Sequence, residues 1–474
     1  MNDKLILKNA SFLFSSDVLV RLISSVAAIL VARHLGSHGY GILSVGMAFT
    51  AIAAYFTDMG LTHTFIREGT KPNVKLDHLI SSFFKTRIVF ALGTALVSII
   101  IIRILYTDTL LIRQVLYVMV LPTILGSALQ GVGVVYFQVT SQMKYTAFIR
   151  GLSGLITAGS LLVGITSNWS LLLISSVYGC SSILGGVTSV LMVTKRISLL
   201  HGWNQSILRG IISFTLGGIV VLMLPQLGPL VLERVTSFQQ VGYYAAAIRI
   251  PIVLYQVPGV LATAFYPLLF EYGNKNQKEN HLKLNIFQLK LMSTLGIIMA
   301  IPFLFYPTWW ITFLFGDEWI ASSRVLAILS CMVILQSINY PLADALTTKG
   351  LQKRRTLTLL VALFVGLVSY ISLGSRLGSI GGGFSAIIIE IILMIGFTIS
   401  NPSGFKLISC GIRYNFISLF FIIVIGFFVL VNISPFIGIP ICILIFLCLS
   451  VSLDREIRKW ILSKIKIKRK EGLL

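Results

Sequence analysis

Apolar residues run along almost the whole chain, in stretches of about 20 that short polar connections separate. Of the 474 residues, 56% are hydrophobic and 11% are charged, whereas an average soluble domain is about 25% charged. A single soluble core stops growing near about 250 to 300 residues, so it could not bury this much apolar surface. The pattern predicts an all-α integral membrane protein, because helices satisfy their own backbone hydrogen bonds in lipid.

The number of apolar stretches predicts about 14 transmembrane helices. These helices use about 280 residues and leave no connection longer than about 20, which is too short for a folded soluble domain. The first six predicted spans are Ser11–Ala32, Gly41–Leu61, Phe83–Leu105, Val115–Phe137, Thr146–Thr166 and Leu171–Val193. The remaining predicted spans begin at Ile207, Val241, Leu291, Ser323, Leu357, Ile380, Gly411 and Phe436.

The distribution of Lys and Arg predicts the orientation of the chain. The formal net charge is +22, and most of the cations fall on one side if both termini are cytoplasmic, as the positive-inside rule requires. They are spread over short loops without a compact basic patch, so no nucleic acid is expected as a partner. Residues 454–474 are expected to form a basic, amphipathic cytoplasmic tail, which either only anchors the topology or lies as an interfacial helix on anionic lipid.

Two parts of the sequence look alike, which predicts an internal repeat. Gly39-Tyr40 is followed by Glu68 after 29 residues, and Gly242-Tyr243 is followed by Glu271 after the same 29 residues. We therefore expect two six-helix lobes, related as parallel repeats and facing each other across a cavity. The predicted divisions are 1–200 for helices 1 to 6, 201–400 for helices 7 to 12, 401–453 for two further helices, and 454–474 for the tail.

Several short motifs resemble those of the bacterial polysaccharide and lipid-linked oligosaccharide flippases, within the multidrug/oligosaccharidyl-lipid/polysaccharide exporter superfamily. The most specific is the turn His34-Leu35-Gly36-Ser37-His38-Gly39-Tyr40-Gly41 between the first two helices. The other matching segments are Asp58-Met59-Gly60-Leu61 with Arg67-Glu68, Pro258 with Phe265-Tyr266-Pro267, and Phe315-Gly316 with Trp319. These motifs resemble the family's markers and do not themselves carry chemistry.

The resemblance implies a transporter and not an enzyme. Such a protein would flip undecaprenyl-diphosphate-linked oligosaccharide repeat units across the bacterial cytoplasmic (inner) membrane by alternating access, for O-antigen, lipopolysaccharide, capsule or exopolysaccharide assembly. A polysaccharide polymerase and chain-length proteins would be its partners, besides the glycan substrate and anionic lipid. The resemblance implies no cofactor, although the cycle could be coupled to H⁺ or Na⁺.

Ionisable residues within the predicted spans are candidates for function, because each costs about 2.5 to 3.5 kcal/mol at the helix centre. Asp17 and Arg21 are four residues apart in the first span and so lie on one face. Two interpretations stay open for this pair. It is either a neutralised ion pair that joins the first helix to a neighbour, or Arg21 is a cavity cation that binds a phosphate.

Arg249 has no acidic residue within one helical turn, so its charge needs water or an anion. It lies about 10 Å into the eighth predicted span, and Gln256 lies two turns further along the same side. A guanidinium presents a planar fork that grips phosphate with two hydrogen bonds. We therefore interpret Arg21 and Arg249 as the substrate-binding cations, with pairing of Arg249 to a distant acid such as Asp58 as the alternative.

Two carboxylates are further candidates for the cavity or for ion coupling. Glu390 lies ten residues into its predicted helix, and a carboxylate at that depth can bind a proton or Na⁺. Asp58 lies near the inner end of the second span, where it could equally be a cap or a boundary residue. The six histidines have no metal-ligand spacing, and no metal site is predicted.

Two other functions compete with the flippase. An ion-coupled multidrug or cation antiporter of the same superfamily should have an acid-rich cavity, which the deep arginines Arg21 and Arg249 disfavour. A membrane polysaccharide polymerase or ligase should have a large outer loop with polar catalytic residues, and the predicted outer loops are mostly too short. The chain has no GxxxxGK[ST] phosphate loop, so it is not itself expected to hydrolyse ATP.

Overall fold

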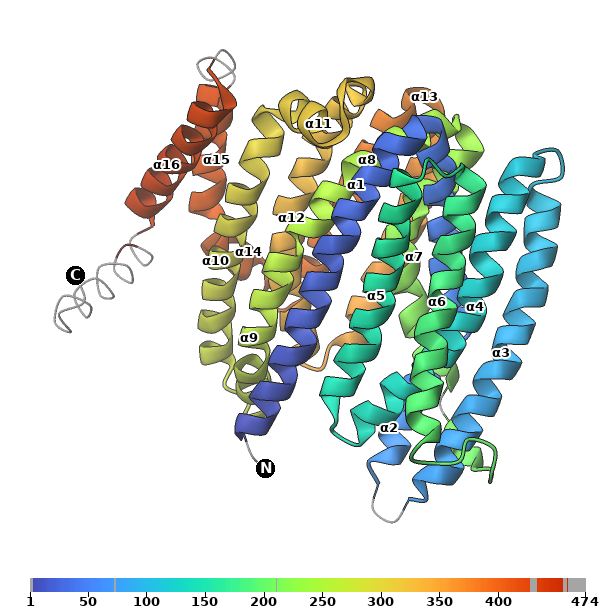
Figure 1. Cartoon of the computed structure of the whole chain (residues 1–474). Coiled ribbons are helices and arrows are strands. Elements are labelled where there is room, and N and C mark those ends of the chain that lie inside the picture. The colour runs from blue at the N-terminus through green and yellow to red at the C-terminus, as the bar shows by residue number, and fades with distance from the viewer. Residues whose placement is uncertain (1–2, 72–73, 210, 427–432, 455–457, 459–474) are drawn as a thin grey trace, which may run out of the picture. The chain divides into compact units, whose positions relative to one another are not determined.

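Helices and the loops between them, without a strand, make up the residues that the computed structural model describes, which are 3–71, 74–209, 211–426, 433–454 and 458 (Figure 1). The first eight α-helices are α1 (Asp3–Phe56), α2 (Leu61–Gly69), α3 (Leu76–Leu105), α4 (Leu110–Val139), α5 (Met143–Thr166), α6 (Leu171–Thr194), α7 (Ile211–Val235) and α8 (Phe238–Leu254). The others are α9 (Gln256–Asn274), α10 (Lys278–Phe305), α11 (Pro307–Phe315), α12 (Ser322–Thr348), α13 (Gln352–Ser400), α14 (Gly404–Gly411), α15 (Arg413–Ile425) and α16 (Pro435–Leu453).

Twelve helices in the described residues are long and apolar enough to cross a membrane, or 13 if the bent pair α14 and α15 forms one span. The predicted all-α, multi-pass membrane fold is confirmed, with a count close to the 14 expected. The difference arises partly because one 48-residue candidate, Leu22–Gly69, contains the second predicted span together with the last part of the first. Gly36 breaks this helix with φ 67°, a left-handed value that glycine adopts without the strain of a Cβ.

The helices form two compact units. One contains residues 1–249 and 370–379, and the other contains 250–369 and 380–474. Helix α13 contributes to both, and Tyr370 in its middle hydrogen-bonds the hydroxyl of Tyr244 at 2.7 Å within the first unit. The lobe boundary predicted near residue 200 stays a prediction. Of the predicted tail, only Asp454 and Arg458 are among the described residues.

In the first unit, α1 and α8 cross with their backbones in contact. A Cβ on Gly41 would overlap the carbonyl of Phe238, and a Cβ on Gly242 would overlap the carbonyl of Ser37. Each glycine therefore contacts the residue that lies four positions before the other glycine. Two helices related by a twofold axis would make such a pair of matching contacts. In this contact Gly41 corresponds to Gly242. The Gly-Tyr pairs of the sequence instead matched Gly39 with Gly242, so the two alignments differ by two residues.

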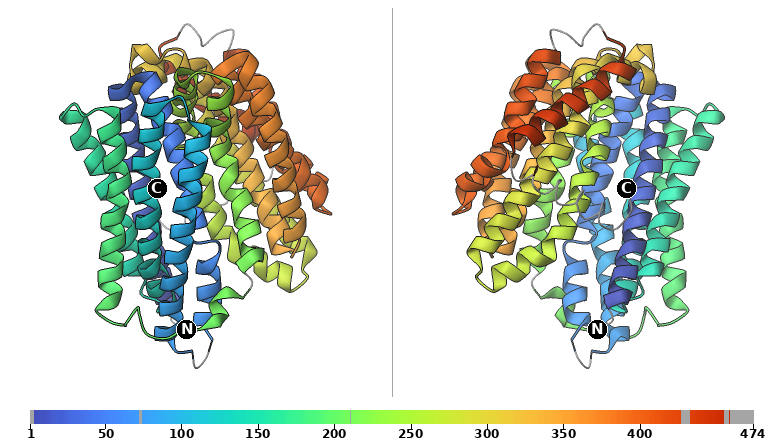
Figure 2. Two further views of the ribbon diagram at one scale, coloured as in Figure 1. Left: turned by 90° about the vertical axis from the view of Figure 1, so that its right-hand side faces the viewer. Right: turned by 90° about the vertical axis from the view of Figure 1, so that its left-hand side faces the viewer.

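In the second unit, α15 and α16 pack beside α10 (Figure 2). Lys290 of α10 forms a buried ion pair with Asp454 at 2.7 Å, directly after the end of α16. Asn415 of α15 donates to Ser293 Oγ of α10 at 2.7 Å and accepts from Ser450 of α16 at 2.8 Å. Polar contacts of this kind hold helices together in lipid, where apolar burial drives association only weakly.

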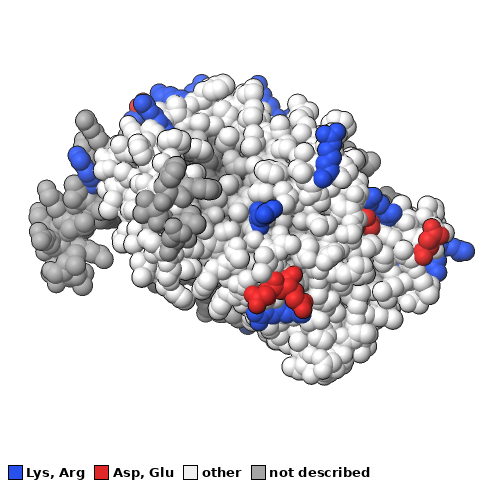
Figure 3. All heavy atoms as spheres, turned by 90° about the horizontal axis from the view of Figure 1, so that it is seen from above, with Lys and Arg blue, Asp and Glu red and all other residues white. Residues whose placement is uncertain are grey.

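The face shown in Figure 3 has few Lys, Arg, Asp and Glu, and they are scattered among uncharged side chains. Two cations lie buried within helices of the described residues. Arg87 of α3 and Lys290 of α10 are each 5% exposed. The assignment of the sides to cytoplasm and exterior, with both termini cytoplasmic, stays a prediction.

Candidate functional site

Arg249 lies in α8 among neutral partners. Its Nε donates to the hydroxyl of Tyr40 at 3.0 Å, and its Nη2 contacts the sulfur of Met47 at 2.9 Å. Both partners belong to α1, just beyond the crossing of the two helices, and Tyr40 is fully buried. The Arg249 side chain itself is half-buried.

No carboxylate among the described residues contacts Arg249. A guanidinium is always charged and carries five N–H donors, and the two contacts to Tyr40 and Met47 leave its charge without a counter-ion. The sequence-based alternative, pairing with Asp58, is not what the structure has. An uncompensated guanidinium at membrane depth can attract an anion such as a phosphate.

Asp58 pairs with a different arginine, which the sequence analysis missed. Its Oδ1 lies 3.2 Å from Nη1 of Arg87 and also accepts from Thr62 Oγ1 at 2.6 Å. Arg87 Nη2 donates to Thr57 Oγ1 at 3.2 Å and to the Ser127 carbonyl at 3.1 Å. This cluster is built from α2, α3, α4 and the residues between α1 and α2, so it neutralises a charge inside the first unit.

Glu390 of α13 is held by two side-chain amides of α12 in the second unit. Its carboxylate accepts from Gln336 Nε2 at 2.9 Å and from Asn339 Nδ2 at 2.8 Å. Gln336 and Asn339 are three residues apart and so lie on one face of α12. Glu390 is 6% exposed, and among the described residues no cation pairs with it.

The side-chain amide oxygens beside Glu390 receive no hydrogen bond from the described residues. Gln336 Oε1 and Asn339 Oδ1 are both buried without a hydrogen-bond partner. Carboxylate and amide oxygens are ligands for hard cations, so Glu390, Gln336 and Asn339 could together hold a proton or Na⁺. No group of three or more His, Cys, Asp or Glu residues in the described part of the chain has metal-site geometry.

The remaining predicted site residues are distributed as follows. Gln256 begins α9, in the second unit, and its Nε2 donates to the Ile252 carbonyl at 3.1 Å. The side chains of Asp17 and Arg21 lie outside the described residues, although the backbone there belongs to α1. The structure therefore brings Arg249 to Tyr40, Asp58 to Arg87, and Glu390 to two amides.

Comparison with known proteins gives a family and a fold. A family model described as polysaccharide biosynthesis protein matches residues 6–273. No curated protein matches the sequence.

Among solved structures, the lipid II flippase MurJ in an inward closed conformation has a TM-score of 0.75 at 15% identity, covering 94% of this chain and 99% of that one. An inward-facing multidrug resistance MATE family transporter of the MOP superfamily has a TM-score of 0.65 at 12% identity, covering 82% and 98%. A MOP superfamily transporter from Pyrococcus furiosus, whose binding pocket is described as having reverse polarity, has a TM-score of 0.57 at 13% identity, covering 84% and 94%. These likenesses show that the fold is that of MOP superfamily transporters.

Proposed function

The chain belongs to the polysaccharide biosynthesis protein family, and from that membership we propose that it is a flippase for undecaprenyl-diphosphate-linked oligosaccharide repeat units. It would work by alternating access in the bacterial cytoplasmic membrane, with both termini cytoplasmic. Its product would feed O-antigen, lipopolysaccharide, capsule or exopolysaccharide assembly. A polysaccharide polymerase and chain-length proteins would take over the flipped units.

The observation that carries this proposal is the uncompensated charge of Arg249. A diphosphate headgroup brings the anionic oxygens that a guanidinium binds with two parallel hydrogen bonds. Tyr40 and Met47 position the Arg249 side chain without neutralising it. Arg21 would be the second such cation, with Asp17 and Gln256 as secondary candidates.

The membrane potential favours outward movement of this substrate. With the cell interior negative, each exported negative charge is favoured by about 2.3 kcal/mol per 100 mV. The empty carrier must then return, and Glu390 offers a site for the H⁺ or Na⁺ that could drive this step. Its carboxylate and the orphaned oxygens of Gln336 and Asn339 support the assignment.

The first test replaces Arg249 with Ala in cells that depend on this protein for surface polysaccharide. Loss of a charge-assisted phosphate contact is worth about 1.5 to 3 kcal/mol, so we expect polymer output to fall by about tenfold or more. Immunoblotting should find the variant in the membrane at normal abundance, because no acid of the described residues pairs with Arg249 and would lose its partner. Normal polymer output from Arg249→Ala, at equal abundance, would refute the assignment.

The second test replaces Glu390 with Gln, which keeps the size of the side chain and removes its charge. We expect normal abundance but loss of the dependence of transport on a proton or sodium gradient, measured with the purified protein in vesicles that carry lipid-linked oligosaccharide. Gln336→Leu is the companion variant, because it removes one amide and leaves the carboxylate. Gradient-dependent transport that survives Glu390→Gln unchanged would exclude Glu390 as the coupling group.

A cation or drug antiporter is the second candidate function, and Glu390 is the feature that favours it. A buried carboxylate in a MATE-like fold could bind a cationic drug as well as a coupling ion. Ethidium efflux from vesicles distinguishes the two functions. Efflux abolished by Glu390→Gln and unaffected by Arg249→Ala would favour the antiporter over the flippase.

A further inference from the structure

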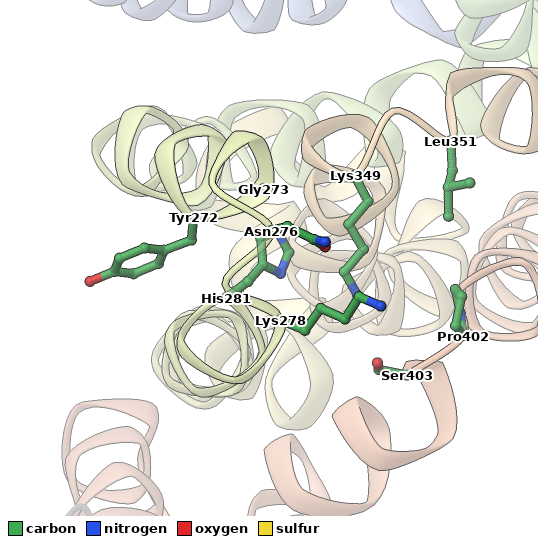
Figure 4. A pocket seen from close by; sticks show the side chains of 9 residues that line it. All are labelled: Tyr272, Gly273, Asn276, Lys278, His281, Lys349, Leu351, Pro402 and Ser403. Carbon is green, nitrogen blue, oxygen red and sulfur yellow. The ribbon is translucent and has the colours of Figure 1, made fainter.

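A cavity of about 310 Å³ lies at one end of the second unit, where several helices begin or end (Figure 4). The ends of α9 and α12, the start of α10 and the loop before α14 surround it. Lys278 and Lys349 reach into this space from α10 and from the end of α12, and Ser403 faces it from the loop. The volume is at the lower end of the range for small-molecule sites, about 300 to 1,000 Å³.

The walls of the cavity are fixed by hydrogen bonds. Asn401, which is 3% exposed, accepts at its Oδ1 from Lys349 Nζ at 3.0 Å and from the backbone N–H of Ser403 at 3.1 Å. His281, which is 1% exposed, contacts Thr348 Oγ1 through its Nε2 at 2.8 Å. Lys349 is therefore held at the wall of the cavity by a hydrogen bond to a buried amide, whereas Lys278 is exposed.

The cavity carries positive charge without a matching acid. Among the described residues, neither Lys278 nor Lys349 contacts a carboxylate, and the only polar partner of the Lys349 ammonium is the neutral amide of Asn401. The nearby acids are occupied elsewhere, since Glu271 pairs with Lys275 at 2.6 Å and Glu279 pairs with Lys283 at 2.7 Å. Burial lowers the pKa of Lys349, which is the cost of holding an ammonium without a counter-ion.

We propose that this cavity binds a phosphate-bearing anion between Lys278 and Lys349. The hydroxyl of Ser403 and the side-chain amide of Asn276 would complete the contacts. The cavity has room for a phosphate or diphosphate group and not for an oligosaccharide. The site is independent of Arg249, which belongs to the other unit, and of the transport function proposed above.

The test measures binding of pyrophosphate to the full-length purified protein in neutral detergent by titration calorimetry. Lys349→Gln and Lys278→Gln should each weaken binding by about tenfold, since each removes one charge-assisted contact. Lys283→Gln is the matched control, because this lysine sits on the same helix but pairs with Glu279 and does not line the cavity. We expect its affinity to stay within about twofold of the parent protein.

A second arm identifies the source of the phosphate. The same variants are reconstituted in vesicles of phosphatidylcholine, with or without phosphatidylglycerol, and their thermal unfolding is measured. If the natural ligand is a lipid headgroup, phosphatidylglycerol should raise the Tm of the parent and of Lys283→Gln but not of Lys349→Gln or Lys278→Gln. If the natural ligand is a soluble phosphate, pyrophosphate but not phosphatidylglycerol should raise the Tm of the parent and of Lys283→Gln without raising that of Lys349→Gln or Lys278→Gln.

The site would be overturned if neither ligand distinguished the cavity variants from Lys283→Gln. A lower Tm of Lys349→Gln with unchanged ligand affinity would show that Lys349 only stabilises the end of α12. If Lys349→Gln fails to fold, Lys278→Gln still tests the site. Lys278 is exposed, so its replacement leaves no buried group without a partner.

Discussion

Arg249 and Arg87 are the same residue type in the same unit, yet their surroundings differ in kind. Arg87 has a carboxylate, a hydroxyl and a carbonyl as acceptors, so its charge is neutralised where it lies. Arg249 has a tyrosine hydroxyl and a thioether sulfur, and neither carries a charge. The contrast indicates that a deep arginine serves structure when the fold supplies its acid, and is available for a ligand when the fold does not.

The strongest way to break this comparison is Arg87→Ala. Removing one member of a buried ion pair leaves Asp58 and the acceptors around it without their donor, so the free energy of unfolding should fall by about 3 to 5 kcal/mol. Thermal unfolding of the purified variant measures this, and we expect poor recovery from the membrane as well. Arg249→Ala serves as the comparison, and an equal loss of stability in both variants would contradict the division of roles.

A double variant sharpens the same point. Arg87→Met combined with Asp58→Leu removes both charges together, and replacement of a buried pair by apolar groups is often close to neutral. We expect the double variant to recover at least about 2 kcal/mol of the stability that Arg87→Ala loses. Chemical denaturation of the parent, Arg87→Met, Asp58→Leu and the double variant gives the coupling energy, and additive losses would mean that the two side chains do not act as a pair.

The smallest expected effect comes from Gly131→Ala. A Cβ at this position in α4 would overlap the guanidinium of Arg87, so the side chain must shift away from Asp58. Overpacking of this kind costs about 1 to 3 kcal/mol, which a thermal melt can resolve. Gly159→Ala in α5 is the matched control, because its added methyl would meet nothing within 4 Å.

Hydropathy was sufficient to predict the fold class, because lipid requires long helices whatever the details of packing. Hydropathy alone could not locate the kink at Gly36 between the first two spans, since the break depends on a single backbone conformation. The sequence also could not predict that Arg87, which lies about 16 Å along α3 from Leu76, pairs with Asp58. The partner of a buried cation depends on how the helices pack.

The candidate site was predictable only in part. The lack of a local acid beside Arg249 could be read from the chain, and the structure bears out that its contacts are neutral. The partners of Glu390 could not be predicted, because Gln336 and Asn339 are more than 50 positions away in the sequence. Two amides three residues apart on an apolar helix are a signal that a search for polar pairs within spans could have used.

The bare crossing of α1 and α8 at Gly41 and Gly242 also has a mechanical consequence. Because no side chains lie between the two backbones at this point, α8 can rotate about the contact while the two helices stay packed together. Arg249 lies seven residues beyond Gly242, which is a lever arm of about 10 Å. A tilt of about 10° there would carry the base of that side chain by about 2 Å, enough to exchange Tyr40 for another acceptor.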